Sequence, residues 1–405
     1  MSGILYLSLT GMTEPLGRSQ VLEYLIDLSK DNRICLVSFE RDSDSDSRET
    51  IDHLVSDADI NWNPLHYTNK FGSISSVMQI IAGMKAGAKC IRHNQVDVIH
   101  ARSMIPALMG LYLKLRYKKK LLFDIRGFST DEKVDRGRIR KNSIIYRVLK
   151  HLEDTLYRKA DNIVTLTHAS KKILSKFYNI SDDRIDVIPT CVNGKLFQRL
   201  SVDASAEFKH SLGYSMNDQI IIHTGNVTGW YLFEDEVRIV RGMMALDDRI
   251  HFLVLNRDQH QQSRDILTHT GIDEKRYRIM QAEFEDVHRY LSISTAAIYF
   301  IKPVFSKKAS APTKFAEMVS CHVPSIVNTG VGDMDDYIEH YHVGLAFNLR
   351  DIVDSPHETA KSVIEYLNSD PENLHKNEYD RLFQSCFDKN IAINKYREIY
   401  RHLSS

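Results

Sequence analysis

Short apolar segments alternate with longer amphipathic segments along the chain, and the alternation occurs in two consecutive series. Segments that are apolar at nearly every position are typical of strands buried on both faces of a parallel sheet. In the first series the predicted strands are Ile4–Leu9, Arg33–Phe39, Val98–His100, Lys120–Ile125, Asn162–Thr167 and Ile185–Ile188. In the second series they are Gln219–His223, His251–Leu255, Tyr277–Met280, Ala297–Ile301, Ser325–Asn328 and Gly344–Phe347.

Helical periodicity fills the gaps between these strands. The predicted helices are Gln20–Ser29, Ser76–Arg92 and Ser143–Lys159, and in the second series Phe233–Ala245, Gln261–Thr268, Phe284–Ile293 and Thr313–Ser320. Alternating strands and helices produce a doubly wound parallel sheet with right-handed crossovers. The predicted fold class is therefore α/β, with two Rossmann-like domains whose ligand-binding strand edges face each other across a cleft.

The length of 405 residues exceeds what one ordinary hydrophobic core accommodates. The polar stretch from Asn193 to Ser205 has no clear periodicity and predicts a linker. We therefore expect an N-terminal domain of residues 1–195 and a C-terminal domain of residues 196–385. The remaining segment, residues 386–405, contains a predicted helix, Ile391–Leu403, that we expect to pack back on the N-terminal domain.

The chain carries 53 basic and 53 acidic residues, so its formal net charge is zero. This balance argues against nucleic acid as a partner, because nucleic-acid binding needs a basic excess that displaces counterions. No targeting segment is visible, and the apolar stretch from Met104 to Leu113 is far shorter than the roughly 20 residues that span a bilayer. These features predict a cytoplasmic protein.

The cysteines are scattered, and no pair has the C-x-x-C spacing or a histidine at metal-binding distance in the sequence. Their number is odd, and they are Cys35, Cys90, Cys191, Cys321 and Cys386. This pattern predicts isolated buried thiols in a reducing compartment, and neither a disulfide framework nor a zinc site.

The segment from Ser310 to Glu317 follows a predicted strand and opens a helix. Ser310 is expected to cap this helix and Pro312 to fit its first turn. Lys314 lies where free N–H groups already attract anions, so it suits a diphosphate. Glu317, three residues later on the same face, can accept hydrogen bonds from the two hydroxyls of a ribose. The structural alternative is a capped helix with a solvated Lys–Glu pair.

A second segment, His223–Tyr231, comes directly after the first strand of the second series. Its two glycines, Gly225 and Gly229, let the backbone approach a ligand closely. A plain connecting turn is the alternative interpretation. The position after the first strand of a Rossmann-like domain favours a ligand, which here would touch Gly225 and Asn226.

Two segments of the first series leave strands at the edge where ligands bind. Gly11–Gln20 is too long for a dinucleotide loop and lacks the G-x-G-x-x-G spacing, so it disfavours NAD and predicts a loop that covers a sugar or an acceptor. Asp124 and Arg126 alternate along a strand end and therefore point to one side. A structural salt bridge and a contact with an acceptor both remain open for this pair.

At these segments the chain resembles family 4 of the retaining glycosyltransferases, which have the GT-B fold, and within it the branch that makes bacterial surface polysaccharides. The similarity covers nearly the whole chain. The matching pieces are Gly11–Gln20, Phe123–Phe128, Val187–Val192, Gly229–Tyr231, Pro312–Glu317 and Gly330–Asp333.

The resemblance implies a metal-independent hexosyltransferase that retains the anomeric configuration, with a nucleotide-sugar as donor substrate and no cofactor. It implies that the acceptor, a glycan or a lipid-linked glycan, binds the N-terminal domain. Lys314, Glu317 and Arg126 are the expected catalytic residues. The expected donor-binding residues are Gly225, Asn226, Ser310, Pro312, Thr313, Lys314 and Glu317. The expected acceptor-binding residues are Gly11, Thr13, Gly17, Arg18, Asp124 and Arg126.

The chain departs from the family pattern at one position. Many members carry two glutamates eight residues apart in the donor segment; the second matches Glu317, and the first falls on Ala309. A GT-B scaffold or regulatory subunit without turnover is therefore an alternative. A metal-dependent transferase would need a D-x-D motif, and the literal matches, Asp42–Asp46 and Asp333–Asp335, are interpreted as structural. A phosphorylase or an epimerase has no residue in its favour.

A basic cluster in the N-terminal domain suggests a further partner. The run Lys114–Lys120 is strongly basic, and more cations precede the helix Ser143–Lys159, which carries an apolar stripe. We expect contact with an anionic membrane surface through the region Lys114–Lys120, at the inner face of the cytoplasmic membrane. In the alternative interpretation the stripe packs on the sheet and the charges are only solvated.

Overall fold

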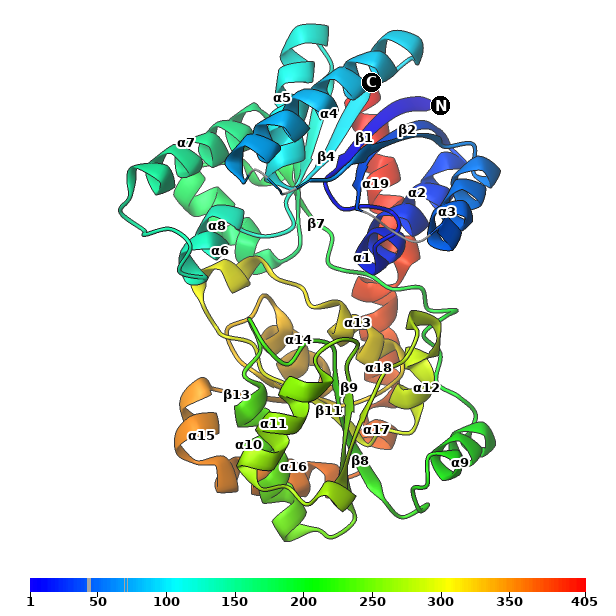
Figure 1. Ribbon diagram of the computed structural model, residues 1–405, viewed down its shortest axis with the longest axis vertical. Coiled ribbons are helices and arrows are strands. Elements are labelled where there is room, and N and C mark those ends of the chain that lie inside the picture. Colours follow the sequence, from blue (N-terminus) through cyan, green and yellow to red (C-terminus); the bar gives the residue numbers. More distant parts are fainter. Residues whose placement is uncertain (42–44, 69, 71) are drawn as a thin grey trace. The chain divides into compact units, whose positions relative to one another are not determined.

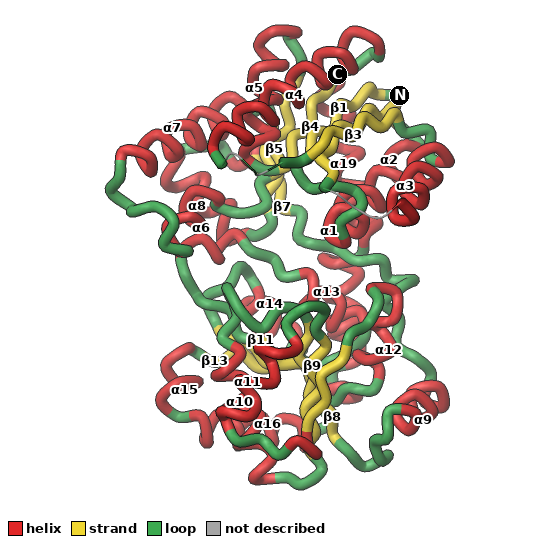
Figure 2. The backbone as a smooth tube through the Cα atoms, viewed as in Figure 1, coloured by secondary structure: helices red, strands yellow, loops and turns green. Residues whose placement is uncertain are grey.

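The computed structural model describes residues 1–41, 45–68, 70 and 72–405, and the chain divides into two compact units. Unit 1 consists of Met1–Pro189 together with Lys389–Ser405, and unit 2 of Thr190–Asp388 (Figure 1). Their limits lie a few residues from the predicted boundaries after residues 195 and 385. Each unit contains one parallel sheet with helices on it (Figure 2), which confirms the predicted α/β class with two Rossmann-like domains.

The sheet of unit 1 has seven parallel strands in the order β3-β2-β1-β4-β5-β6-β7. Six of them match predicted strands. β3 was missed because its sequence contains Pro64 and the polar residues Asn61 and Asn63, and is therefore not typical of a buried strand. It lies at the edge of the sheet, where partial burial suffices. The strands are β1 (Ser2–Ser8), β2 (Asn32–Glu40), β3 (Asn61–His66), β4 (Val98–Arg102), β5 (Lys120–Asp124), β6 (Asn162–Thr165) and β7 (Ile185–Val187).

Helices cover both faces of this sheet. α4 (Ser73–His93) and α5 (Met104–Tyr117) pack together on one face, while α2 (Glu23–Ser29) and the C-terminal helix α19 (Lys389–Ser404) pack on the other (Figure 1). Because side chains alternate along a strand, even-numbered residues such as Tyr6 and His100 face α19. The other helical segments are α1 (Pro15–Gly17), η1 (Arg18–Leu22), α3 (Ser45–Asp57), α6 (Ser129–Asp135), α7 (Ile144–Lys159), α8 (His168–Tyr178) and η2 (Asp182–Arg184).

The sheet of unit 2 has six parallel strands in the order β10-β9-β8-β11-β12-β13, all at predicted positions. They are β8 (Gln219–Thr224), β9 (Ile250–Leu255), β10 (Tyr277–Met280), β11 (Ala296–Tyr299), β12 (Ser325–Asn328) and β13 (Gly344–Phe347). The helical segments are α9 (Val202–Ser211), α10 (Phe233–Leu246), α11 (His260–Thr270), η3 (Glu274–Arg276), η4 (Phe284–Asp286), α12 (Val287–Ser292), η5 (Phe305–Ala309), α13 (Thr313–Ser320), α14 (Met334–Tyr341), α15 (Leu349–Asp354), α16 (Pro356–Asn368), α17 (Pro371–Leu374), α18 (Lys376–Leu382) and η6 (Phe383–Phe387).

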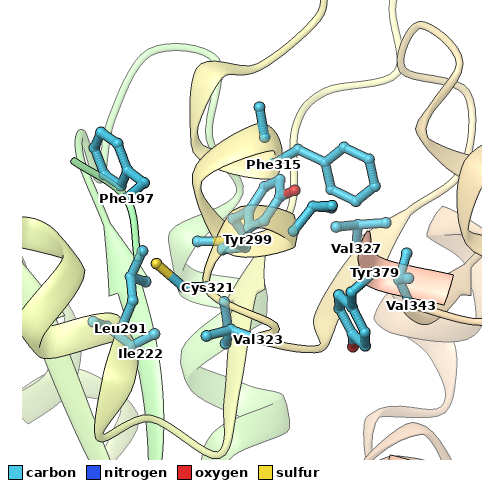
Figure 3. Packing of buried hydrophobic residues seen from close by; sticks show 14 of the residues in the cluster. Phe197, Ile222, Leu291, Tyr299, Phe315, Cys321, Val323, Val327, Val343 and Tyr379 are labelled. Carbon is cyan, nitrogen blue, oxygen red and sulfur yellow. The ribbon is translucent and has the colours of Figure 1, made fainter. Parts of the chain in front are cut away.

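The strands of unit 2 are apolar at consecutive positions because each face of the sheet has its own core. Ile222 and Tyr299 contribute to one cluster, and Ile221 and Ile298 to the other. Phe315 of α13 packs in the first cluster near Tyr299 and Val327 (Figure 3). This packing fixes α13, and with it the side chains on its other face, at the carboxyl end of the sheet.

Two expectations about the chain were wrong. Cys35 of β2 and Cys90 of α4 form a disulfide, with their Cα atoms 6.3 Å apart, so these two cysteines are not isolated thiols. They are 55 residues apart in sequence, and only the packing of α4 on the sheet brings them together. The expected linker is also partly helical, because α9 begins at Val202. No helix among the described residues is long and apolar enough to cross a membrane.

Candidate functional site

The start of α13 is free of side-chain caps. The helix begins at Thr313 with Pro312 at its N-cap position, and no side chain accepts a hydrogen bond there. The prediction that Ser310 caps the helix is therefore wrong, because Ser310 lies two residues further back and ends η5. A helix start without a capping side chain leaves N–H groups that an anion can satisfy.

Lys314 extends from this first turn into the protein, with 8% of its surface exposed. Its ammonium group donates to the carbonyl oxygen of Thr224 at the end of β8. It also lies 4.1 Å from the ring centroid of Tyr231 and 5.1 Å from that of Tyr299. A carbonyl and two aromatic faces attract a cation without neutralising it, so the positive charge remains available to an anion.

Glu317 is the second expected donor residue on α13. Its carboxylate makes no hydrogen bond or ion pair within the described part of the chain, so the predicted alternative of a Lys–Glu pair is not observed. Although part of the side chain reaches the surface, burial raises the pKa of Glu317 to about 7, and the nearby charge of Lys314 opposes this increase only partly. A half-buried, unpaired acceptor is what a pair of ribose hydroxyls requires.

The turn Gly225–Asn226 lies directly beside Lys314. Gly225 adopts a φ of 92°, and a Cβ at this position would be 3.5 Å from the Lys314 Nζ atom. The carbonyl groups of the turn are held from within the unit: Asn256 donates to Gly225 O at 2.8 Å, and His223 Nε2 to Asn226 O at 3.1 Å. The N–H of Asn226 makes no hydrogen bond in the described residues, so it is available to a ligand.

A buried pair supports this turn from below. His223 Nδ1 lies 2.5 Å from Glu236 Oε2, and both side chains are fully buried. The other carboxylate oxygen of Glu236 accepts from the Phe300 N–H at 2.9 Å. Because the Asn226 carbonyl can only accept, the His223 Nε2 atom must carry a proton. The pair therefore fixes the imidazole and the backbone turn in one arrangement.

Sequence reasoning missed further cations around the Gly225–Tyr231 loop. Lys302 donates to Gly229 O at 2.9 Å, and Lys307 Nζ lies 4.0 Å from the ring centroid of Trp230. Both precede the donor segment, in the stretch that joins β11 to α13. The three lysines at positions 302, 307 and 308 were the available signal, because they follow a strand that ends at the ligand-binding edge. They supply positive charge that the loop itself lacks.

In unit 1, Glu40 organises the segment that begins at Gly11. Its carboxylate accepts from the N–H groups of Met12 and Thr13 at 3.0 and 3.2 Å and from the Thr13 hydroxyl at 3.1 Å. Gly17 is packed so closely that a Cβ would be 1.8 Å from Gly11 O. The expected loop is helical from Pro15 onward, so the prediction of a loop is wrong for that part of the segment. Arg18, in the π-helical turn η1, is exposed.

Asp124 and Arg126 are brought together as predicted, with Arg126 Nη1 3.5 Å from Asp124 Oδ1. Burial alone would raise the Asp124 pKa, but Arg126, His100 and Arg102 lower it to about 2, so the carboxylate is ionised. The helix α19 contributes two side chains that sequence reasoning missed. The Tyr396 hydroxyl donates to Asp124 Oδ2 at 3.4 Å, and the Tyr400 hydroxyl lies 2.7 Å from His100 Nδ1.

The described residues contain no group of three or more His, Cys, Asp or Glu side chains that could hold a metal ion. The two overlapping D-x-D matches in Asp42–Asp46 lie outside the residues whose side chains the structure describes. In the match Asp333–Asp335, Asp335 Oδ2 accepts from the Gly330 N–H at 3.1 Å, in the turn before α14. Asp335 therefore has a structural partner.

The comparison with protein families gives one match. Residues 30–195 match the model of Glycosyltransferase Family 4. The matched segment makes up most of unit 1. The sequence of the chain matches none of the curated proteins.

Several solved structures resemble this chain over nearly its whole length. Sucrose-phosphate synthase from Thermosynechococcus elongatus has a TM-score of 0.72 and 15% identity over 100% of this chain and 99% of that chain. HepE from Anabaena in complex with UDP-glucose has a TM-score of 0.70 and 12% identity, over 99% of this chain and 100% of that chain. WaaG, a glycosyltransferase involved in lipopolysaccharide biosynthesis, has a TM-score of 0.68 and 10% identity, over 99% of each chain. At these identities the likeness shows the fold, which is GT-B.

Proposed function

We propose that this protein is a retaining, metal-independent glycosyltransferase. It moves a hexose-type sugar from a nucleotide-sugar to a glycan or lipid-linked acceptor, in the biosynthesis of surface polysaccharides in the cytoplasm. The observation that carries the proposal is the buried Lys314 at the uncapped start of α13, directly beside the Gly225 turn. That HepE binds UDP-glucose and that WaaG acts in lipopolysaccharide biosynthesis supports the choice of substrates.

The donor has a defined place in unit 2 under this proposal. Its diphosphate is bound by Lys314, by the first N–H groups of α13 at Thr313 and by the Asn226 N–H, while Glu317 accepts hydrogen bonds from the ribose. Ser310 and Pro312 border the phosphates or the sugar. Negative charge grows on the diphosphate as the glycosidic bond breaks, so a fixed cation and fixed N–H groups stabilise the transition state more than the ground state.

The acceptor hydroxyl attacks the anomeric carbon from the side that the diphosphate leaves, and the departing diphosphate takes its proton. The anomeric configuration is thereby retained, and no nucleophilic side chain is required. The chain's own contribution is to position the two substrates and to stabilise charge. In unit 1 the acceptor is placed by Asp124 and Arg126 and by the segment that contains Gly11, Thr13, Gly17 and Arg18.

The test combines binding and turnover by the purified protein. A thermal-shift screen against nucleotide-sugars identifies the donor, because a ligand that binds only the folded state raises the apparent melting temperature. Release of nucleoside diphosphate in the presence of glycan acceptors then measures transfer. The alternative, a scaffold without turnover, has Ala309 in its favour, and it predicts donor binding without any release of diphosphate.

A peripheral membrane contact through unit 1 belongs to the same proposal. The apolar stripe of α7 is buried only toward its C-terminal end, while Ile144, Ile145 and Val148 at its start are 78, 61 and 53% exposed. Exposed cations lie beside them, at Arg138, Arg140, Lys141 and Arg147. In the run Lys114–Lys120, by contrast, Lys114 is paired with Asp161 at 2.5 Å. The start of α7 is therefore a better candidate for contact with the membrane than the run Lys114–Lys120.

Co-sedimentation with vesicles of phosphatidylglycerol and phosphatidylcholine tests this contact. We expect binding that weakens as salt increases, because each cation near an anionic leaflet contributes about 1 kcal/mol and salt screens it. The variant Ile144→Ser/Ile145→Ser should reduce binding strongly, and the charge reversal of Lys118, Lys119 and Lys120 should reduce it less. Absence of binding at low salt would point to a soluble acceptor.

A further inference from the structure

Arg102 is the last residue of β4, at the carboxyl end of the strand. In the register of the sheet it pairs with Ser8 of β1 on one side and with Asp124 of β5 on the other. In the sheet of unit 1, β2 and β3 lie on one side of β1, and the later strands, from β4 onward, lie on its other side. In open α/β sheets, ligands bind outside the carboxyl ends of the strands where the strand order switches sides in this way. Arg102 therefore occupies the position in unit 1 where a ligand is expected.

The guanidinium group of Arg102 forms no ion pair with a carboxylate in the described part of the chain. Only 5% of the residue is exposed, and its Nε atom is buried without a hydrogen-bond partner. Within the described part of the chain the side chain makes neither a hydrogen bond nor an ion pair. Burial of an unpaired charge opposes folding. An unpaired arginine at a ligand-binding edge therefore indicates an anionic ligand that is not part of the protein.

The neighbouring groups leave an excess of positive charge. Arg126 is the cation that interacts most strongly with Arg102, and Asp124 is the acidic group that shares this site. Burial lowers the pKa of Arg102, with Arg126 adding to the effect, and it also lowers the pKa of His100, which is therefore neutral. Two guanidinium groups and one carboxylate carry a net charge of one positive unit. The cluster can be neutralised by one added anionic group.

The start of α5 adds to the positive electrostatic potential around Arg102. Ser103 follows Arg102 and has a φ of 76°, a conformation that non-glycine residues adopt at a cost and that is concentrated at binding sites. It occupies the N-cap position of α5 without making a side-chain cap. The helix has 14 residues, so its N-terminal N–H groups present partial positive charge beside Arg102.

We propose that Arg102 and Arg126 together bind one anionic group, a carboxylate or a phosphate, of the sugar acceptor. This inference rests on the proposed function and narrows it, because it makes the acceptor an acidic or phosphorylated sugar. Guanidinium groups suit this purpose since their paired N–H donors match the oxygens of carboxylate and phosphate. The diphosphate of the donor has the same chemistry, so the test must separate the two sources.

The experiment measures ligand binding to the full chain by calorimetry. The probes are glucose 6-phosphate and glucuronate, with glucose as the neutral control and UDP as the donor control. We expect both anionic sugars to bind at least tenfold more tightly than glucose. Arg102→Gln should remove this advantage and leave the UDP affinity within twofold of wild type. Arg92→Gln, which removes an exposed charge from α4, is the matched control and should change neither.

The stability of the variant separates a binding role from a structural one. Without ligand, Arg102→Gln should unfold at the same temperature as the wild type or at a higher one, because an unpaired buried charge is removed. A large fall in its melting temperature would show a structural residue and overturn the proposal. Arg102→Lys, which keeps the charge but not the paired donors, should bind the anionic sugars with intermediate affinity.

Two further results would contradict the inference. If neither anionic sugar binds more tightly than glucose while UDP binds, the acceptor is neutral and the proposed function still holds. If Arg102→Gln weakens UDP and spares the anionic sugars, the charge serves the donor diphosphate. A protein that binds no nucleoside diphosphate or nucleotide-sugar at all would instead contradict the proposed function itself.

Discussion

At the scale of single residues, Lys314 is the side chain whose role depends most on its surroundings. It is buried between a carbonyl and two aromatic rings, and no carboxylate among the described residues forms an ion pair with it. We expect Lys314→Met to weaken the binding of a nucleoside diphosphate by about 2 kcal/mol, or roughly 30-fold, as for the loss of a charge-assisted hydrogen bond. Lys361→Met, at an exposed position of α16, is the control and should bind normally.

Glu317 predicts a pH dependence whose sign follows from its raised pKa of about 7. The ionised carboxylate can accept hydrogen bonds from both ribose hydroxyls, whereas protonation turns one of its oxygens into a donor and weakens this contact. The affinity for a nucleotide-sugar should therefore increase between pH 6 and pH 8, by at most about tenfold per pH unit. Calorimetry at several pH values tests this, and Glu317→Gln should give a weaker and flat profile.

The same shift has a consequence for the free protein. Because the folded state holds the Glu317 proton up to about pH 7 and the unfolded chain releases it near the ordinary value of 4.5, stability contributed by the protonated form is lost as the pH rises through this interval. Urea unfolding should show a smaller decline between pH 5 and pH 7 in Glu317→Gln than in the wild type. An identical decline would mean that Glu317 titrates normally.

At the scale of elements, the sequence predicted where α13 lies but not how it begins. The run Pro312–Glu317 has clear helical periodicity, while the choice between Ser310 and Pro312 as the N-cap depends on how η5 enters the helix. The positions of Lys314 and Glu317 on one face followed from helical spacing. The burial of Lys314 against Tyr231 and Tyr299 did not, because those rings come from distant segments.

The C-terminal helix α19 gives the clearest prediction at this scale. Its Tyr400 hydroxyl lies 2.7 Å from His100 Nδ1 in the interior of unit 1. Tyr400→Phe leaves that nitrogen without a partner, so we expect a loss of about 1–3 kcal/mol in the free energy of unfolding. Tyr112→Phe changes an exposed hydroxyl on α5 and should have little effect in the same urea titration.

At the scale of the whole molecule, the sequence predicted two doubly wound sheets because buried parallel strands are apolar at consecutive positions. The edge strand β3 is half-buried and its residues are not apolar at consecutive positions, so that rule could not find it. The Cys35–Cys90 disulfide and the side chains that α19 places near Asp124 join residues far apart in sequence. Such contacts depend on how helices pack, which periodicity does not determine.

The proposed mechanism requires no metal, and this is a property of the whole enzyme. Transfer should continue at its full rate in the presence of EDTA, because Lys314 and the first N–H groups of α13 supply the positive charge at the diphosphate. A rate that collapses in EDTA and recovers with Mg²⁺ or Mn²⁺ would show that a metal ion carries that charge. The assay is release of the nucleoside diphosphate with and without the chelator.

The central claim is that unit 2 binds the nucleotide-sugar donor at the start of α13. Its most direct test is calorimetric titration of wild type, Lys314→Met and Glu317→Gln with UDP-glucose and with the GDP- and ADP-linked sugars. We predict that one nucleotide class binds the wild type with one site per chain and that both variants bind it at least tenfold more weakly. Wild-type affinity in both variants, or no binding of any donor to the wild type, would contradict the claim.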